Sequence, residues 1–370
     1  MSSRVFLAAF LTRATAALLF SAAGFLGAGG DAEAIHTFGA YARDVVLAPT
    51  SASLEERAYN AGLTDIEGSY LGALTESVEP LKGAWTTGGD TTMPFVFLHA
   101  VVYALWDTPF AYVLLTSLLS AFATAYFAGA VAAAPRDNWW FILNPASIYF
   151  AATHHKEGLT EVGILLFSGG MHQTSYLPVL LGAGLVGAIR PSFLPFLGIL
   201  WLGVLPVMQR LRPRLVVGLA FLVFALAPSA FIPELANPEG AGPVYSVVYS
   251  SQMATRVLGP AVGLLLPMPF AIPLSYGHWI AGTFLTLYGL FHLRILLPVG
   301  RFIVRAKGVG HQITRDLNPV IIIVLLLAYR FAGSSGLTER FVACFLPVLI
   351  AVFLRVRQDR AAVEPVGGLL

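Results

Sequence analysis

Four neighbouring polar side chains stand in the otherwise apolar stretch NPASIYFAATHHKEGL, residues 144–159. They are His154, His155, Lys156 and Glu157. Ionisable groups of this kind near membrane depth usually face a protein interior or an aqueous cavity, where they bind a substrate. The alternative is that Lys156 reaches lipid headgroups while Glu157 occupies the positively polarised first turn of a helix. The pattern indicates either a substrate-binding motif or an ordinary pair of helix ends.

A carboxylate follows the first long apolar run, in the stretch GAGGDAEAIHTFGAYARD. Held at the boundary between lipid and water, Asp31 could act as a general base that accepts the proton of an acceptor hydroxyl. The same residue also suits the N-cap of an amphipathic helix over residues 32–43. Asp31 is therefore a candidate catalytic residue with a structural alternative.

Two arginines are further candidates for substrate binding. Arg190, in GAIRPSF, carries a permanently charged, forked group that suits a phosphate or diphosphate, although contact with lipid phosphate would also explain it. Arg256 ends the segment 233–256, in which tyrosines and serines alternate with small residues. Such a segment could line a sugar site, and it is equally typical of an aromatic belt at the membrane interface.

The composition identifies the elements that must position these residues. Hydrophobic residues make up 57% of the chain and charged residues 11%. Because lipid offers no partners to backbone groups, and the apolar runs are too continuous for barrel strands, the spans should be helices. We expect an all-α polytopic membrane protein with about 9–11 membrane helices and a long outer loop after the first. The single cysteine, Cys344, excludes a disulfide within the chain.

Apolar runs of about 17–25 residues give the candidate spans. We expect the first to be a retained helix rather than a cleaved signal peptide. Three regions are shorter or broken, namely 93–107, the pair 138–152 and 157–170, and the proline-rich 256–273. The clear candidates are 5–27, 110–133, 174–189 with 192–208, 214–232, 274–297, 317–333 and 338–355.

Basic residues predict the orientation, because they favour cytoplasmic loops. Arginine and lysine gather at residues 210–214, at 301–315 and in the C-terminal tail, whereas residues 28–91 carry ten acids against three bases. We therefore expect both termini in the cytoplasm of an inner or plasma membrane, with loop 28–91 outside. An even number of crossings before residue 208 then requires 93–107 to lie at the outer face. The motif at 154–157 falls on that same outer side.

These expectations define one transmembrane domain over residues 1–370. Its parts are an outer region at 28–109 with interfacial helices, a helical bundle at 110–355 and a cytoplasmic tail at 356–370. The first partner that we expect for the protein is the lipid bilayer. The sequence contains no His/Cys spacing typical of a metal site, no phosphate-binding glycine loop and no basic surface for nucleic acid.

Three stretches resemble the polytopic GT-C-type glycosyltransferases, which use polyprenyl-phosphate-linked sugars. They are GDAEAIHTFGAYA after the first helix, the pair of apolar helices that begins MPFVFLHAVVYALWDTPF, and LNPASIYFAATHHKEGL. The resemblance covers about residues 14–170. Many family members are longer than 370 residues and have an Asp-Asp or Asp-x-Asp pair in the first loop and a soluble C-terminal domain, all of which this chain lacks.

The resemblance implies a function and roles for individual residues. A sugar on a polyprenyl phosphate would enter from the bilayer, and a glycan or protein acceptor would attack its anomeric carbon on the extracytoplasmic face. Asp31 would be the base, and Lys156 and Arg190 would hold the lipid phosphate. No divalent metal is indicated as a cofactor.

Three alternatives stay open. A polysaccharide polymerase or ligase would need the same outer-face cations. A transporter or flippase would use 93–107 and 256–273 as broken helices around a midplane site. A non-catalytic subunit of a membrane complex could keep a glycosyltransferase-like body without the reaction.

Overall fold

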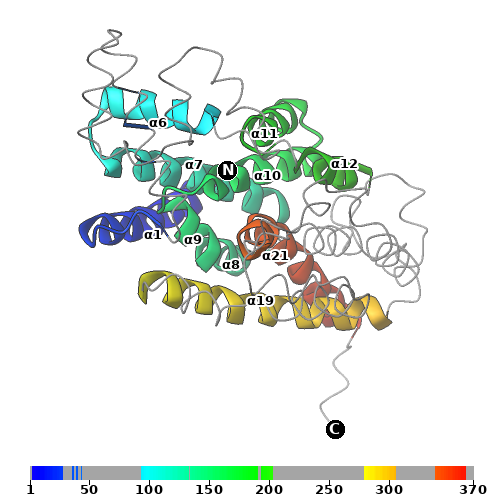
Figure 1. The fold of residues 1–370 in the computed structure, drawn as a ribbon. Coiled ribbons are helices and arrows are strands. Elements are labelled where there is room, and N and C mark those ends of the chain that lie inside the picture. Colours follow the sequence, from blue (N-terminus) through cyan, green and yellow to red (C-terminus); the bar gives the residue numbers. More distant parts are fainter. Residues whose placement is uncertain are drawn as a thin grey trace, which may run out of the picture.

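The computed structural model describes residues 2–27, 36, 39–40, 43, 93–132, 134–190, 193–202, 279–305 and 338–363. Every regular element in these ranges is a helix, and none of them contains a strand (Figure 1). The predicted all-α class is confirmed for this part of the chain.

Three helices in the described ranges are long and apolar enough to cross a membrane. They are α1 (Ser3–Ala22), α7 (Pro109–Val131) and the stretch Gly282–Arg301 of α19 (Trp279–Arg305). Each overlaps a span that the sequence predicts. The total of about 9–11 membrane helices stays a prediction. The predicted spans 214–232 and 317–333 lie outside the described residues.

Helix α7 begins where the sequence supplies a cap. The Thr108 Oγ1 atom accepts a hydrogen bond from the backbone N–H of Phe110 at 3.4 Å, and Pro109 takes the first helical position, where an N–H would have no partner. The preceding helix, α6 (Met93–Leu105), has only 13 residues. It packs against α7 and is shorter than the roughly 17 residues that a membrane span requires.

The predicted segment 138–152 is broken into two short helices, α8 (Asn138–Ile142) and α9 (Pro145–Ala151). The break falls at Asn144, whose side chain accepts a hydrogen bond from the backbone N–H of Ala146 at 3.1 Å. Pro145 cannot continue a preceding helix but fits the first position of a new one. This Asn-Pro pair therefore turns the chain just before the motif. A 3₁₀ turn, Pro135–Asp137, precedes α8.

Helix α10 (Lys156–His172) lies at the centre of the bundle, with neighbours on several sides. It packs against α7, α9, α11 (Tyr176–Ile189) and α21 (Thr338–Val363). Glycine lets α11 approach closely, since a Cβ atom on Gly182 would lie 2.5 Å from the backbone N of Phe167 and closer still to the carbonyl of Gly163. A following helix, α12 (Leu194–Leu202), contacts both α10 and α11.

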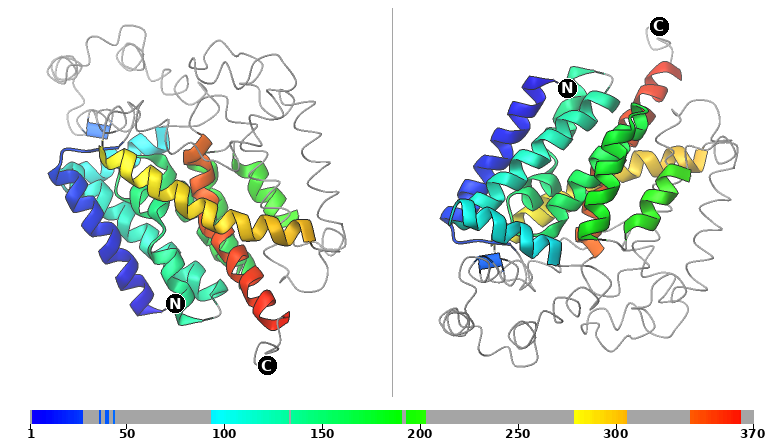
Figure 2. Two further views of the ribbon diagram at one scale, coloured as in Figure 1. Left: turned by 90° about the horizontal axis from the view of Figure 1, so that it is seen from below. Right: turned by 90° about the horizontal axis from the view of Figure 1, so that it is seen from above.

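The bundle has two distinct ends. The first residues of α1 and the last turns of α21 lie at one end, and α6 lies at the other, where α1 finishes (Figure 2). Helix α21 continues to Val363, so the predicted tail 356–370 begins as a helix rather than as an irregular segment. The start of α1 and the end of α21 thus lie at the end of the bundle opposite to α6.

Candidate functional site

The motif lies at the end of the bundle where α1 finishes. Residues 153–155 form the connection between α9 and α10, and the His154 N–H donates to the carbonyl oxygen of Leu26 at 2.8 Å. This bond joins two segments that are far apart in the sequence. The chain that leaves α1 therefore runs directly beside the motif.

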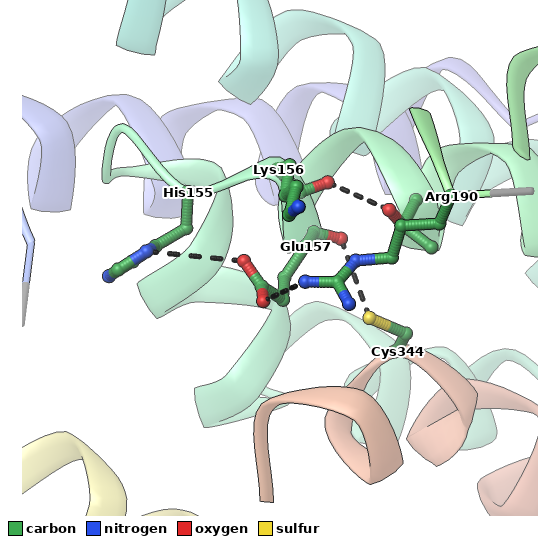
Figure 3. A network of polar contacts seen from close by, with 6 residues as sticks. His155, Lys156, Glu157, Arg190 and Cys344 are labelled. Atoms are coloured by element: carbon green, nitrogen blue, oxygen red, sulfur yellow. Dashed lines mark hydrogen bonds and ion pairs between the residues drawn. The ribbon is translucent and has the colours of Figure 1, made fainter. Parts of the chain in front are cut away.

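Glu157 and Arg190 form a buried ion pair at this end (Figure 3). Glu157 lies in the first turn of α10 and Arg190 caps the C-terminus of α11, with 2.6 Å between Glu157 Oε1 and Arg190 Nη2. The two residues are only 1% and 2% exposed. The sequence singled out both residues but did not predict that they bind each other.

Three further groups surround the ion pair. The second carboxylate oxygen of Glu157 lies 4.0 Å from Nδ1 of His155, which is the N-cap residue of α10. The Cys344 thiol of α21 donates to the backbone carbonyl of Glu157 at 3.7 Å. The Arg190 guanidinium also lies 5.4 Å from the centre of the Phe193 ring. Arg190 and His155 thus contact the carboxylate itself, while Cys344 and Phe193 contact the Glu157 backbone and the Arg190 guanidinium.

Lys156 is the only partly exposed member of the motif, since His154, His155 and Glu157 are buried. Its backbone carbonyl accepts a hydrogen bond from Thr160 Oγ1 at 2.8 Å in the first turn of α10 (Figure 3). The side chain is thus the motif group nearest to the surface. Its role in holding a phosphate stays a prediction.

A cluster of histidines and tyrosines lies on the other side of His154. His99 Nε2 lies 3.2 Å from Nδ1 of His154, and the Tyr103 hydroxyl lies 2.7 Å from Nδ1 of His36 and 3.5 Å from the same His154 atom. The Tyr112 ring of α7 stacks on His99 with 3.5 Å between ring centres. This His/Tyr cluster ties α6, α7 and the segment after α1 to the motif.

Burial keeps the imidazole of His154 neutral. The loss of hydration, together with the neighbouring His99, His36 and His155, lowers its pKa from 6.5 to about 2. Burial also raises the pKa of the Tyr103 hydroxyl. His154 and Tyr103 are therefore uncharged hydrogen-bonding groups at ordinary pH.

A second buried polar layer, which the sequence did not indicate as functional, crosses the middle of the bundle. Arg13 of α1 donates to Ser120 Oγ at 2.9 Å and to Thr124 Oγ1 at 3.0 Å, both on α7. Glu161 of α10 accepts a hydrogen bond from Ser147 of α9. Arg13 interrupts an apolar run in the sequence, and that interruption was the available indication of an interior partner.

Two predicted residues, Asp31 and Arg256, lie outside the described residues, so their roles stay predictions. Within the described ranges, no group of three or more His, Cys, Asp or Glu side chains could hold a metal ion. The structure therefore brings together the motif residues and Arg190 from the predicted set.

Comparisons of the chain with protein-family models, with curated proteins and with solved structures each found no match.

Proposed function

We propose that the protein is a membrane glycosyltransferase that moves a sugar from a polyprenyl-phosphate donor to an acceptor on the extracytoplasmic face. The observation that supports this proposal best is the convergence of the motif, Arg190 and the end of α1 at one end of an apolar helical bundle. A lipid-linked donor needs a site of this kind, because its chain stays in the bilayer while its phosphate needs a cation.

Sugar transfer from a polyprenyl phosphate requires a cation and a negatively charged base in the site. A cation must stabilise the phosphate that leaves the anomeric carbon, and Arg190, or Lys156 next to its partner Glu157 in the sequence, would supply it. A base must accept the proton of the acceptor hydroxyl. Asp31 follows Leu26 by five residues in the sequence, a separation that spans at most about 18 Å. That separation limits how far the proposed base can lie from the bond between His154 and Leu26.

One observation favours a second candidate function, a non-catalytic subunit with a glycosyltransferase-like body. Glu157 already neutralises Arg190 inside the protein, and buried ion pairs also occur where they only hold segments together. In this case the polar end would fix the bundle for a partner enzyme, and Asp31 would be dispensable.

A transfer assay distinguishes the two functions. The purified chain in lipid nanodiscs would be given a mixture of glycan and protein acceptors and a panel of polyprenyl phosphates that carry different radiolabelled sugars, and release of polyprenyl phosphate would be measured. We expect turnover with one donor and a loss of about 100-fold or more in Asp31→Asn, because general-base catalysis is lost. Asp107→Asn is the matched control, since Asp107 is an exposed acid that pairs with Arg43 near the same end of the bundle.

Two results of this assay would contradict the proposed roles. If the Asp31→Asn variant transfers sugar as fast as the wild-type chain, Asp31 is not the base. If the chain has no activity alone, and a membrane complex that contains it works equally well with Asp31→Asn, the subunit function is correct.

A further inference from the structure

We infer that the Glu157 carboxylate is an internal substitute for a phosphate ligand, which occupies Arg190 in the resting protein and is displaced when a phosphate group binds. The inference rests on the proposed function for the choice of a lipid-linked phosphate. It adds a regulatory role for Glu157, whose carboxylate would compete with the ligand for the same cation.

The geometry around Glu157 is that of an anion-binding site with its anion in place. One carboxylate oxygen is 2.6 Å from the Arg190 guanidinium, and the other is 4.0 Å from the imidazole of His155. The carboxylate also stands in the first turn of the 17-residue helix α10, where the helix dipole stabilises negative charge. Three groups that favour an anion thus surround a single carboxylate (Figure 3).

The position of the pair makes an exchange of partners feasible. Both residues belong to helix ends, because Glu157 is in the first turn of α10 and Arg190 follows the last residue of α11. A change of rotamer at either end would separate them without breaking a helix. Glu161, one turn further along α10, differs in this respect because its carboxylate is bound by the Ser147 hydroxyl inside the bundle.

Phosphate matches the same donors better than a carboxylate does. Arginine binds both groups through its planar fork. The released polyprenyl phosphate is a monoester with three acceptor oxygens and close to two negative charges at neutral pH, whereas the sugar-linked donor is a diester with one. Displacement would leave Arg190 with the more highly charged partner and release Glu157. The ligand binds only the molecules in which Arg190 is not held by Glu157. The apparent Kd is then the intrinsic Kd divided by the fraction of such molecules.

The test compares two glutamates on one helix. The affinity of the purified protein in neutral-lipid nanodiscs for polyprenyl phosphate would be measured for the wild-type chain, Glu157→Gln and Glu161→Gln. We expect Kd to fall by about tenfold in Glu157→Gln, since the internal competitor is gone. Glu161→Gln makes the same substitution at an equally buried position without freeing Arg190, and we expect its Kd to match the wild type.

Four ligands identify the source of the phosphate. Polyprenyl phosphate, phosphatidic acid and inorganic phosphate share the charged group, while the neutral polyprenol lacks it. If Glu157→Gln binds only polyprenyl phosphate more tightly than the wild-type chain does, the result supports the lipid-linked donor. If Glu157→Gln binds all three phosphates more tightly than the wild-type chain does, the site accepts anions without preference for the lipid. If Glu157→Gln also binds polyprenol more tightly, the inference is overturned.

A second variant covers the case in which Glu157→Gln does not fold. Glu157→Asp keeps the charge but shortens the side chain by one methylene, so it should weaken the contact with Arg190 and lower Kd by a smaller factor. The inference is overturned if neither variant binds polyprenyl phosphate more tightly than Glu161→Gln does. Since this readout is binding, a chain that exchanges Glu157 for phosphate but transfers no sugar would contradict only the proposed function.

Discussion

At the scale of single residues, a buried ion pair between Glu157 and Arg190 lies at the end of the bundle that carries the motif. His154, Glu157 and Arg190 could be selected because ionisable groups are costly in an apolar chain. The bond between Glu157 and Arg190 joins residues 33 positions apart, and their pairing depends on how α10 and α11 pack. No local pattern encodes such a contact. For the same reason the roles of Arg13 and Glu161 in the middle layer were missed.

His154 provides a prediction for the pH dependence of stability. Its folded pKa of about 2 lies below the usual 6.5, so the unfolded chain binds the extra proton first as the pH falls. The contribution of this residue to stability is therefore complete above pH 6.5 and is lost progressively as the pH falls toward 2. We expect the free energy of unfolding to lose about 1.4 kcal/mol per pH unit from this group below its unfolded pKa.

The measurement is denaturant unfolding in detergent micelles between about pH 5 and pH 8, for the wild-type chain and His154→Asn. The wild type should lose stability more steeply on the acid side. The difference between the two chains should stay constant on the alkaline side, which serves as the internal control. Parallel curves over the whole range would show that His154 is not buried as a neutral imidazole.

At the scale of the helices, the sequence predicted the long apolar elements well and the interrupted one poorly. Spans over 5–27 and 110–133 correspond to α1 and α7, because length and composition determine such helices. The sequence placed 138–152 among the shorter or broken regions but did not locate a break within it. It is divided at Asn144, since the Asn-Pro pair caps and starts a new helix. Composition averaged over a window does not detect a single capping residue.

The approach of α11 to α10 gives a prediction at this scale, because it places Arg190 beside Glu157. Alanine at Gly182 would put a Cβ atom against the backbone of Gly163 and Phe167. We expect Gly182→Ala to lower the free energy of unfolding by about 1–3 kcal/mol, as is usual for overpacking of a close contact. Thermal unfolding of the purified protein measures the effect.

Gly184 is the matched control, since it belongs to the same helix and a Cβ atom there would meet nothing within 4 Å. Gly184→Ala should be neutral or stabilise the protein by up to about 1 kcal/mol, because alanine favours the helix. Equal effects of the two substitutions would mean that α10 and α11 are not held together through Gly182.

At the scale of the whole molecule, the composition predicted a membrane protein of the all-α class. The described helices confirm the helical class, and three of them are long and apolar enough to cross a membrane. Both chain ends were expected on one side of the membrane. The start of α1 and the last turns of α21 share one end of the bundle, opposite the end with the motif and α6 (Figure 2). Their location in the cytoplasm, and the total number of spans, stay predictions because hydropathy and charge counts do not define the crossings in segments such as 256–273.

The central claim is that the end of the bundle with the motif receives a lipid-linked phosphate. Photo-crosslinking tests it most directly, with a polyprenyl-phosphate sugar whose photoreactive group lies next to the phosphate, followed by mass spectrometry of the labelled peptides. We expect label on residues 153–157, at the C-terminus of α11 and on α6, and competition by unlabelled polyprenyl phosphate. Label confined to the opposite end, near the 3₁₀ turn Pro135–Asp137 and the last turns of α21, would contradict the claim.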